Sequence, residues 1–133
     1  MTTPPPALIQ LEIDDPASAW EAAGFAIADD GACLVGSVTL RFRTDARGEG
    51  IRSWSFSELD ADVTTIDGLP LAVAGEPAAP VDHPNTASAI DHLVVQTPDV
   101  ERTVQALEAA GLAERRRRHT ESYGSPMTQV FHR

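Results

Sequence analysis

The peptide Glu-Ala-Ala-Gly-Phe-Ala at residues 21–26 returns almost unchanged as Glu-Ala-Ala-Gly-Leu-Ala at residues 108–113. Each copy follows an apolar run typical of a strand and a helix pattern that opens at a proline. A unit that occurs twice favours an architecture made by duplication, so the chain is interpreted as two related modules. The repeat constrains the fold strongly and the chemistry only weakly.

The second copy has the clearer pattern. Residues 90–96 form an apolar, β-branched run that predicts a mostly buried strand. A helix should follow, with Thr97 as its cap, Pro98 at its first position and Gly111 as its left-handed stop. Two more strands are expected, over residues 112–119 and 127–133.

The first copy repeats this order more briefly. Its strand covers residues 8–13, Asp15 is expected to cap the helix, and Gly24 should end it, with Pro16 opening it. The strand alternates between an apolar face (Ile9, Leu11, Ile13) and a more polar face (Leu8, Gln10, Glu12). Further strands are predicted over residues 25–28, 32–35, 38–43 and 51–56.

These patterns predict an α+β fold made of paired βαβββ modules that form mixed, curved sheets. The expected parts are a disordered tail (1–7), a first module (8–57), an irregular linker (58–89) and a second module (90–133) that lacks its last strand. The third strand of the second module would then be an open edge, and open edges recruit other strands. We expect either a homodimer whose partner strand covers this edge or a natural chain that is longer.

Composition limits the partners and the cellular compartment that are expected for this chain. The formal net charge of −10 argues against general nucleic-acid binding. No apolar run is long enough for a membrane span, and the first residues do not resemble a signal peptide, so no membrane partner is expected. The single cysteine, Cys33, fits a reducing cytoplasm and is expected to be a small buried hydrophobe.

Four consecutive arginines, residues 115–118, invite a phosphate-binding interpretation. Strand alternation would send two of these side chains to each face, and Glu114 and Glu121 flank the run. A solvated strand edge with ion pairs is the better account.

Paired modules with a histidine inside an Ile-Asp-His-Leu-Val-Val strand (90–95) resemble the vicinal oxygen chelate superfamily. That superfamily includes glyoxalases, bleomycin-resistance proteins and extradiol dioxygenases, and the match is nearest to its glyoxalase-like domains. The Thr-Pro-Asp helix start (97–99), the Glu-Ala-Ala-Gly-Leu stop and the final Gln-Val-Phe-His-Arg (129–133) support the resemblance. It covers residues 8–43 and 90–133.

The resemblance implies a cup in which the first and last strands of each module direct ligands at a divalent metal. By position, the first-strand sites are Gln10 and His92, and the last-strand site of the first module is Arg41. The fourth site would lie just beyond Arg133. Gln10 can ligate through its amide oxygen, whereas Arg41 has no lone pair to give and attracts anions instead.

Two interpretations stay open for each site residue. His92 is either a metal ligand or general base, and so the catalytic residue, or a half-buried strand histidine hydrogen-bonded to its neighbours. Arg41 is either an anion clamp oriented by Glu12 or one half of a cross-strand ion pair that closes an unused cavity. Gln10, Glu12 and Arg41 are thus the predicted ligand-binding residues.

Three functions follow from the resemblance. The first is a glyoxalase-like protein that binds a small oxygen-rich or anionic molecule and acts as a metal-assisted lyase, isomerase or dioxygenase. The second is a non-enzymatic small-molecule binding or sequestering protein of the bleomycin-resistance type. The third is a structural remnant whose modules mediate oligomerisation.

Overall fold

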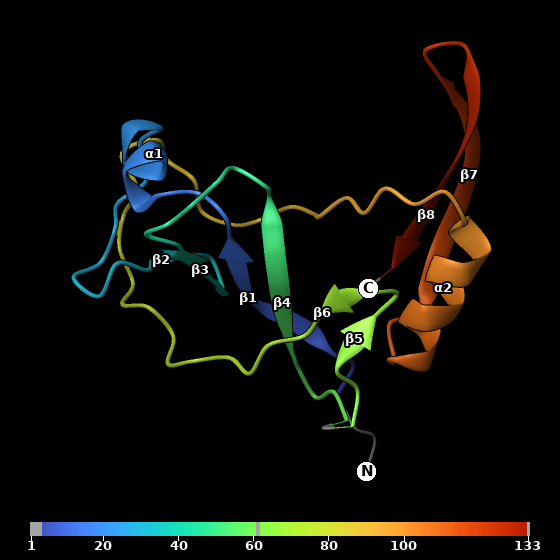
Figure 1. Ribbon diagram of the computed structural model, residues 1–133, viewed down its shortest axis with the longest axis horizontal. Coiled ribbons are helices and arrows are strands. Elements are labelled where there is room, and N and C mark those ends of the chain that lie inside the picture. Colours follow the sequence, from blue (N-terminus) through green and yellow to red (C-terminus); the bar gives the residue numbers. More distant parts are fainter. Residues whose placement is uncertain (1–3, 61, 133) are drawn as a thin grey trace.

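The computed structural model describes residues 4–60 and 62–132. Its strands and helices follow one another along the chain in mixed order (Figure 1). They are β1 (Ala7–Ile13), α1 (Ala17–Ala22), β2 (Cys33–Val35), β3 (Val38–Phe42), β4 (Ile51–Ser57), β5 (Thr65–Ile66), β6 (Leu69–Pro70), α2 (Val100–Ala109), β7 (Glu114–Ser122) and β8 (Ser125–His132). The α+β class with a mixed sheet is confirmed.

The centre of the fold is a four-stranded sheet with the order β2-β3-β1-β4. Strand β1 runs parallel to β3 and antiparallel to β4, and Leu11 lies opposite Leu40 on one side and Trp54 on the other. The predicted alternation holds from Gln10 to Ile13, where Leu11 and Ile13 are buried in the apolar core of the sheet. It is wrong for the start of β1: the register with β4 shifts between Leu8 and Gln10, and Leu8 instead of Ile9 packs against the core. Cys33 is fully buried in the edge strand β2, as expected.

Helix α1 covers the apolar face through an aromatic cluster. The Trp20 ring lies 5.0 Å from Phe25 and 5.6 Å from Phe42, measured between ring centroids. The predicted cap of this helix is wrong: the N-cap residue is Pro16, and no side chain caps the helix. The predicted strand at residues 25–28 is also wrong, since only the N–H of Ala28 bonds across to Ala32.

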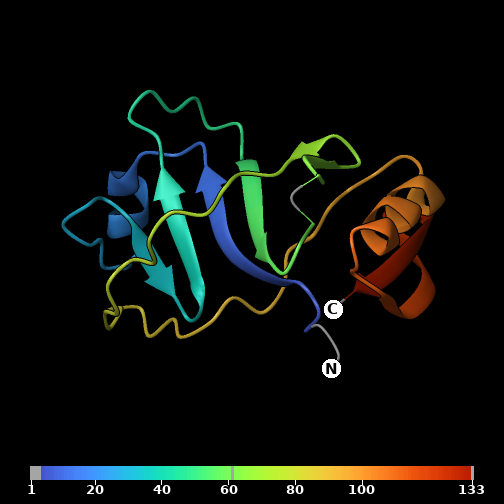
Figure 2. The same ribbon diagram turned by 90° about the horizontal axis from the view of Figure 1, so that it is seen from below.

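The linker winds around the sheet. It forms the two short strands β5 and β6, whose continuation at Leu71 bridges to Trp54. Residues 75–78 then lie on the polar face of the sheet, where the N–H of Ala78 bonds to Thr39 (Figure 2). Residues 87–93 return on the opposite, apolar face. The predicted irregular linker (58–89), together with residues 90–93 beyond it, therefore covers both faces of the sheet.

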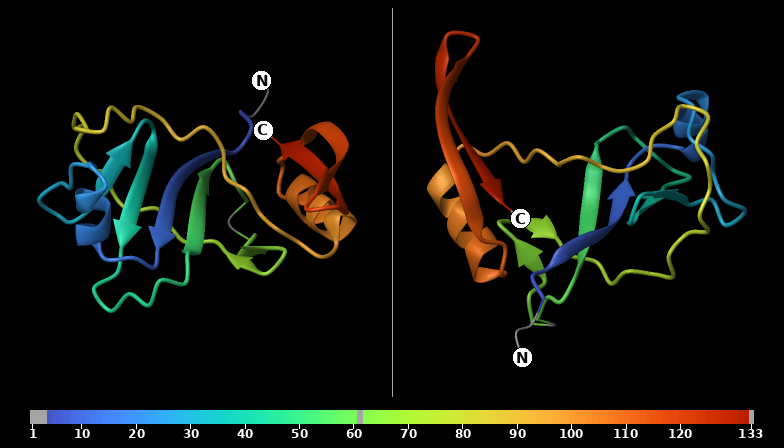
Figure 3. Two further views of the ribbon diagram at one scale, coloured as in Figure 1. Left: turned by 90° about the horizontal axis from the view of Figure 1, so that it is seen from above. Right: turned by 180° about the vertical axis from the view of Figure 1, so that it is seen from behind.

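The second copy of the repeat lies at the other end of the molecule from α1 (Figure 3), and its Ala110 and Leu112 share one hydrophobic core cluster with the sheet. Helix α2 buries Val104 and packs against β5 and β8. Strands β7 and β8 pair with each other from Glu114↔His132 to Ser122↔Ser125, and the described residues provide neither with another strand partner. Within β7, Arg117 forms ion pairs with Glu114 and Glu101, in line with a solvated, ion-paired strand edge.

Two predictions for this unit are wrong. Residues 90–96 form no strand, because the described chain places no strand edge within hydrogen-bonding distance of them. The N-cap of α2 is Asp99, whose carboxylate accepts from the N–H of Arg102, while Thr97 bonds to the Asp99 N–H at 3.1 Å. Of the elements predicted for the second βαβββ module, the structure has the helix and the hairpin but not the opening strand.

Two predicted boundaries lie at the ends of the described residues. The predicted tail at residues 1–7 lies partly outside the described residues, and Ala7 already belongs to β1, where it pairs with Ser57. Arg133, which was assigned to the final strand, also lies outside them. Among the described residues, neither helix has the length and apolar character needed to cross a membrane.

Candidate functional site

The structure brings together two of the predicted ligand-binding residues, Gln10 and Arg41. Both side chains emerge on the polar face of the sheet, because β1 and β3 run in parallel with Gln10 opposite Thr39 and Glu12 opposite Arg41. The guanidinium Nε of Arg41 donates to the side-chain oxygen of Gln10 at 2.8 Å. Gln10 is buried, so this hydrogen bond satisfies a polar group that would otherwise be costly to bury.

The covering segment closes over this pair. The N–H of Gly75 donates to the same Gln10 oxygen at 3.1 Å, and Arg41 donates to the carbonyl of Glu76. A side chain at residue 75 would put its Cβ only 3.0 Å from the Arg41 guanidinium, so glycine allows the close approach. The Gln10 side chain and the Glu76 carbonyl thus accept hydrogen bonds from Arg41, and Asp30 lies 3.9 Å from the guanidinium.

Glu12 does not orient Arg41. Its carboxylate lies 3.7 Å from the guanidinium of Arg43, which also contacts Asp45 at 3.4 Å. The sequence correctly placed Glu12 on the same sheet face as Arg41, but register alone does not choose between two arginines spaced two residues apart.

His92 lies on the extended coil between the two units. Its side chain is 68 % exposed, and its Nδ1 is 2.6 Å from the carboxylate of Asp91. The hydrogen bonds of the described chain give it no other partner. Neither interpretation of His92 matches its surroundings. It does not lie in a half-buried strand, and no other potential metal ligands converge on it in the described chain.

A divalent metal does not fit these residues as they are placed. Among residues 4–60 and 62–132, no three histidine, cysteine, aspartate or glutamate side chains gather as a metal group. The oxygen of Gln10 already accepts two hydrogen bonds and lies beside a guanidinium cation, which repels a metal ion. No catalytic step is therefore assigned to a metal here.

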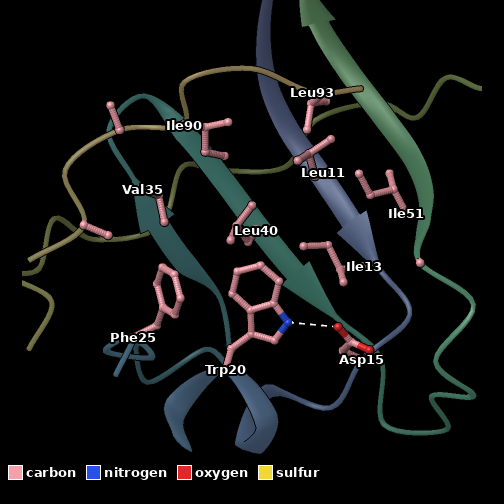
Figure 4. A pocket seen from close by; sticks show the side chains of 13 residues that line it. Leu11, Ile13, Asp15, Trp20, Phe25, Val35, Leu40, Ile51, Ile90 and Leu93 are labelled. Carbon is pink, nitrogen blue, oxygen red and sulfur yellow. Dashed lines mark hydrogen bonds between the residues drawn. The ribbon is translucent and has the colours of Figure 1, made fainter. Parts of the chain in front are cut away.

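A cavity lies on the other face of the sheet. It has a volume of about 380 Å³ and is lined almost entirely by apolar side chains (Figure 4). Its lining comprises Leu11, Ile13, Asp15, Trp20, Phe25, Val35, Leu40, Gly50, Ile51, Ala87, Ala89, Ile90 and Leu93. We call it the apolar pocket.

Three parts of the chain build the apolar pocket. The sheet provides its aliphatic floor through Leu11 and Leu40. Trp20 of α1 and Phe25, three residues after the end of the helix, provide an aromatic wall. The third part is the extended segment 87–93, which we call the strap. Ile90 and Leu93 of the strap point toward the sheet across the pocket (Figure 4).

The strap is held by packing rather than by its backbone. No backbone-to-backbone hydrogen bond joins residues 88–96 to the rest of the described chain. Gly36, at a φ of +62°, lets the strap approach closely, because a Cβ there would lie 3.1 Å from the Cα of Ala89. Side-chain contacts alone hold few segments rigidly, so the strap is the part of the pocket wall with the least local stability.

His83 anchors the chain just before the strap. The N–H of Ala26 donates to its Nδ1 at 2.9 Å, so the ring proton lies on Nε2, which is 2.7 Å from the carbonyl oxygen of Leu34. The ring also makes an edge contact with Phe25, with centroids 5.4 Å apart. Sequence reasoning missed this role, because nothing local in the sequence specifies partners more than 45 residues away.

Asp15 is the one titratable residue in the lining of the apolar pocket. Its Oδ2 accepts a hydrogen bond from the indole Nε1 of Trp20 at 3.0 Å. The sequence pointed to Asp15 as a helix cap, and its position beside a proline gave no hint of a place in a cavity wall.

A second, smaller groove of about 280 Å³ lies between the outer edge of β4 and residues 93–96. The carbonyl of Trp54 on that edge accepts from the N–H of Ala72, so this side of β4 faces away from β1 and is only partly covered. The groove is more polar than the apolar pocket because Arg52, Ser53 and Gln96 line it.

Comparison of the chain with protein-family models, with curated proteins and with solved structures finds no match. The function is proposed from the geometry of the described residues.

Proposed function

We propose that the protein is a non-enzymatic binding protein that holds a small, largely apolar molecule in the apolar pocket. The observation that carries this proposal is the cavity of about 380 Å³, with its aliphatic floor, its aromatic wall and its single carboxylate. Small-molecule sites are typically concave, mostly apolar and equipped with a few polar groups that fix orientation. Within the resemblance described above, this corresponds to the binding or sequestering class rather than to the metal-dependent enzymes.

The polar face supports a ligand less well. Gln10 and Arg41 bond to each other and to the segment that covers them, so an oxygen-rich or anionic ligand would have to displace the bonds to Gly75 and Glu76. Displacement of satisfied buried hydrogen bonds costs free energy, which the ligand's own contacts must compensate. The apolar pocket needs no such exchange.

The expected affinity is modest. A one-ring ligand that buries about 150–200 Å² of apolar surface gains roughly 4–5 kcal/mol at about 25 cal/mol per Å². Association entropy reduces that gain. A dissociation constant on the order of 1 mM is therefore expected for a bare hydrocarbon ring.

The two tryptophans provide the test. Trp20 lines the apolar pocket, whereas Trp54 lines the smaller groove beside β4, so their indole N–H resonances distinguish a ligand in the apolar pocket from one in the groove. Titration with toluene should shift the Trp20 resonance progressively and leave that of Trp54 in place. Trp54→Phe identifies the signals without loss of a hydrogen bond, because the Trp54 Nε1 has no partner among the described residues.

A matched pair of variants places the site. Ala87→Phe puts a ring into the apolar pocket and should abolish the Trp20 shift, whereas Ala79→Phe adds the same ring at an exposed position outside the lining and should preserve it. No saturable Trp20 shift with toluene or cyclohexane, up to their solubility, would contradict the proposal.

A further inference from the structure

We infer that Asp15 makes the apolar pocket selective for cationic amines, that is, for ligands with a compact apolar body and one ammonium group. This inference rests on the proposed function and adds the chemical class of the ligand. Its basis is the position of a carboxylate in a lining that is otherwise free of titratable side chains.

One oxygen of the Asp15 carboxylate is available to a ligand. Trp20 donates to Oδ2, and the described residues place no donor within hydrogen-bonding distance of Oδ1. A carboxylate accepts several hydrogen bonds when ionised, so this group keeps most of its accepting capacity. Figure 4 shows Asp15 at the end of the pocket, with its carboxylate directed at the indole.

The carboxylate is held in place before any ligand arrives. Its partner Trp20 is wedged between the rings of Phe25 and Phe42. The carbonyl of Asp15 also accepts from the N–H of Arg43 at 3.2 Å, which fixes the backbone at this position. A preorganised acceptor loses little entropy on binding, which favours affinity.

Asp15 is not needed elsewhere. It does not cap α1, whose N-cap is Pro16 with no side-chain hydrogen bond. The arginines nearby are engaged with other carboxylates: Arg43 contacts Glu12 and Asp45, and Arg52 contacts Glu49. The negative charge in the pocket therefore has no protein cation opposite it in the described chain.

An ammonium group meets one favourable feature at this end of the pocket. It forms a charge-assisted hydrogen bond with the free carboxylate oxygen, a bond stronger than a neutral one. An anionic ligand with the same ring would instead be repelled by Asp15.

The test compares three probes that share one ring: toluene, benzylammonium and benzoate, each followed by the Trp20 indole resonance. Benzylammonium should bind about tenfold more tightly than toluene, as expected for a hydrogen bond to a charged group. Benzoate should bind more weakly than toluene. Asp15→Asn keeps an oxygen that accepts from Trp20 but removes the charge, so it should bring the benzylammonium-to-toluene ratio close to one while toluene still binds.

The control for overall charge is Asp82→Asn. Asp82 is exposed and outside the lining, so its replacement lowers the protein's net negative charge without touching the pocket and should leave the ratio unchanged. If toluene binds but the wild-type ratio is near one, or if Asp15→Asn retains the preference, the inference is overturned and the proposed function stands. If no probe shifts Trp20, the proposed function itself fails. The benzylammonium-to-toluene affinity ratio of the wild-type protein tests the inference even if Asp15→Asn does not fold.

Discussion

The two copies of the repeat fold alike at their helix ends and differently at their strands. Gly24 and Gly111 both take left-handed conformations, with φ values of +95° and +96°. In each, the glycine N–H bonds back to the glutamate three residues earlier, and the next residue bonds to the carbonyl five residues earlier. The opening strand of the first copy, in contrast, is the centre of a sheet, while the matching segment of the second copy is coil.

This contrast separates structural features that depend on residues near in sequence from features that depend on distant parts of the chain. A helix stop needs only a glycine and nearby carbonyls, so equal sequence gives equal structure. A strand needs neighbours to accept its hydrogen bonds, and β1 finds β3 and β4 because three more strand segments follow it within 50 residues. Residues 90–96 have as strong a β pattern, but the hairpin that follows α2 pairs only with itself among the described residues.

The largest expected difference is in amide hydrogen exchange. Amides of β1, such as those of Leu11 and Glu12, should be protected by factors of roughly 10³ or more, because their exchange requires disruption of the sheet. Amides at residues 91–96 should exchange within about tenfold of the free-chain rate. Mass spectrometry or NMR on the same sample measures both segments.

Strong protection at residues 91–96 would contradict the coil seen in the structure. Protection that rises with protein concentration would indicate that a second copy supplies the missing strand neighbour, as the sequence predicted for an open edge. Protection independent of concentration would indicate pairing within one chain.

Core substitutions should differ by several kcal/mol between the two copies. Leu11 and Leu93 follow the two first-strand sites at equivalent positions, but Leu11 is 2 % exposed and Leu93 only half-buried. Leu11→Ala should lower the free energy of unfolding by roughly 2–5 kcal/mol, and Leu93→Ala by about 1 kcal/mol. Denaturant unfolding with a common m-value gives both numbers.

Val94→Ala is the exposed control in the same segment. Its side chain is 72 % exposed, so the free energy of unfolding should change by less than about 0.5 kcal/mol. A loss near that of Leu11→Ala would mean that residues 90–96 are buried in solution.

The glycine stops allow a finer comparison. Gly24→Ala and Gly111→Ala both force an L side chain into the left-handed region, at about 1–2 kcal/mol each. A Cβ on Gly24 would also meet the Cβ of Asn85 at 2.8 Å, whereas one on Gly111 meets only Pro6, at 3.3 Å. Gly24→Ala should therefore cost about 1 kcal/mol more, since Asn85 must move and weaken its bond to the Gly24 carbonyl.

Equal losses of unfolding free energy from the two glycine variants, in thermal or denaturant unfolding, would show that Asn85 is readily displaced. The strap, which begins two residues after Asn85, would then be held less firmly than the structure indicates. Toluene binding should fall in Gly24→Ala and not in Gly111→Ala.

Much of the fold could be predicted from the sequence because its determinants are short-range. The alternation of β1 from Gln10 to Ile13, the strands at β2, β3 and β4 and both glycine stops follow from periodicity and turn chemistry. The register shift between Leu8 and Gln10 does not, because it depends on pairing with β4. The meeting of Gln10 and Arg41 on one face of the sheet also follows from alternation, once two strands are adjacent. These features need no knowledge of distant partners.

The candidate site could not be predicted in the same way. The apolar pocket exists because the strap crosses the sheet, and the course of the strap is set by His83 bonding to Ala26 and Leu34. Asp15 has the sequence context of a helix cap, and only the packing of Trp20 turns its carboxylate to the pocket. Both depend on tertiary contacts that sequence periodicity does not encode.

The smallest expected effect concerns the link between the two regions. Asp67, in the turn between β5 and β6, accepts from the Arg102 Nε of α2 at 2.8 Å and from the Thr103 hydroxyl. These hydrogen bonds, that of Arg102 foremost, lower the pKa of Asp67 below its ordinary value of 3.8. A carboxyl with a lowered folded-state pKa stabilises the fold above its unfolded-state pKa, and this contribution is lost as the pH falls through the folded-state value.

Thermal unfolding between pH 7 and pH 2.5 tests this link, followed by resonances of α2 and of β1 separately. The α2 resonances should lose stability below about pH 4, and Asp67→Asn should reduce that loss while it lowers the midpoint at pH 7. Some dependence will remain in the variant, because the hydrogen bond from Arg117 also lowers the pKa of Glu114 within the carboxy-terminal unit. If Asp67→Asn shifts the unfolding midpoints reported by β1 and by α2 equally, the two regions unfold as one cooperative unit. The difference between them is then limited to local amide hydrogen exchange.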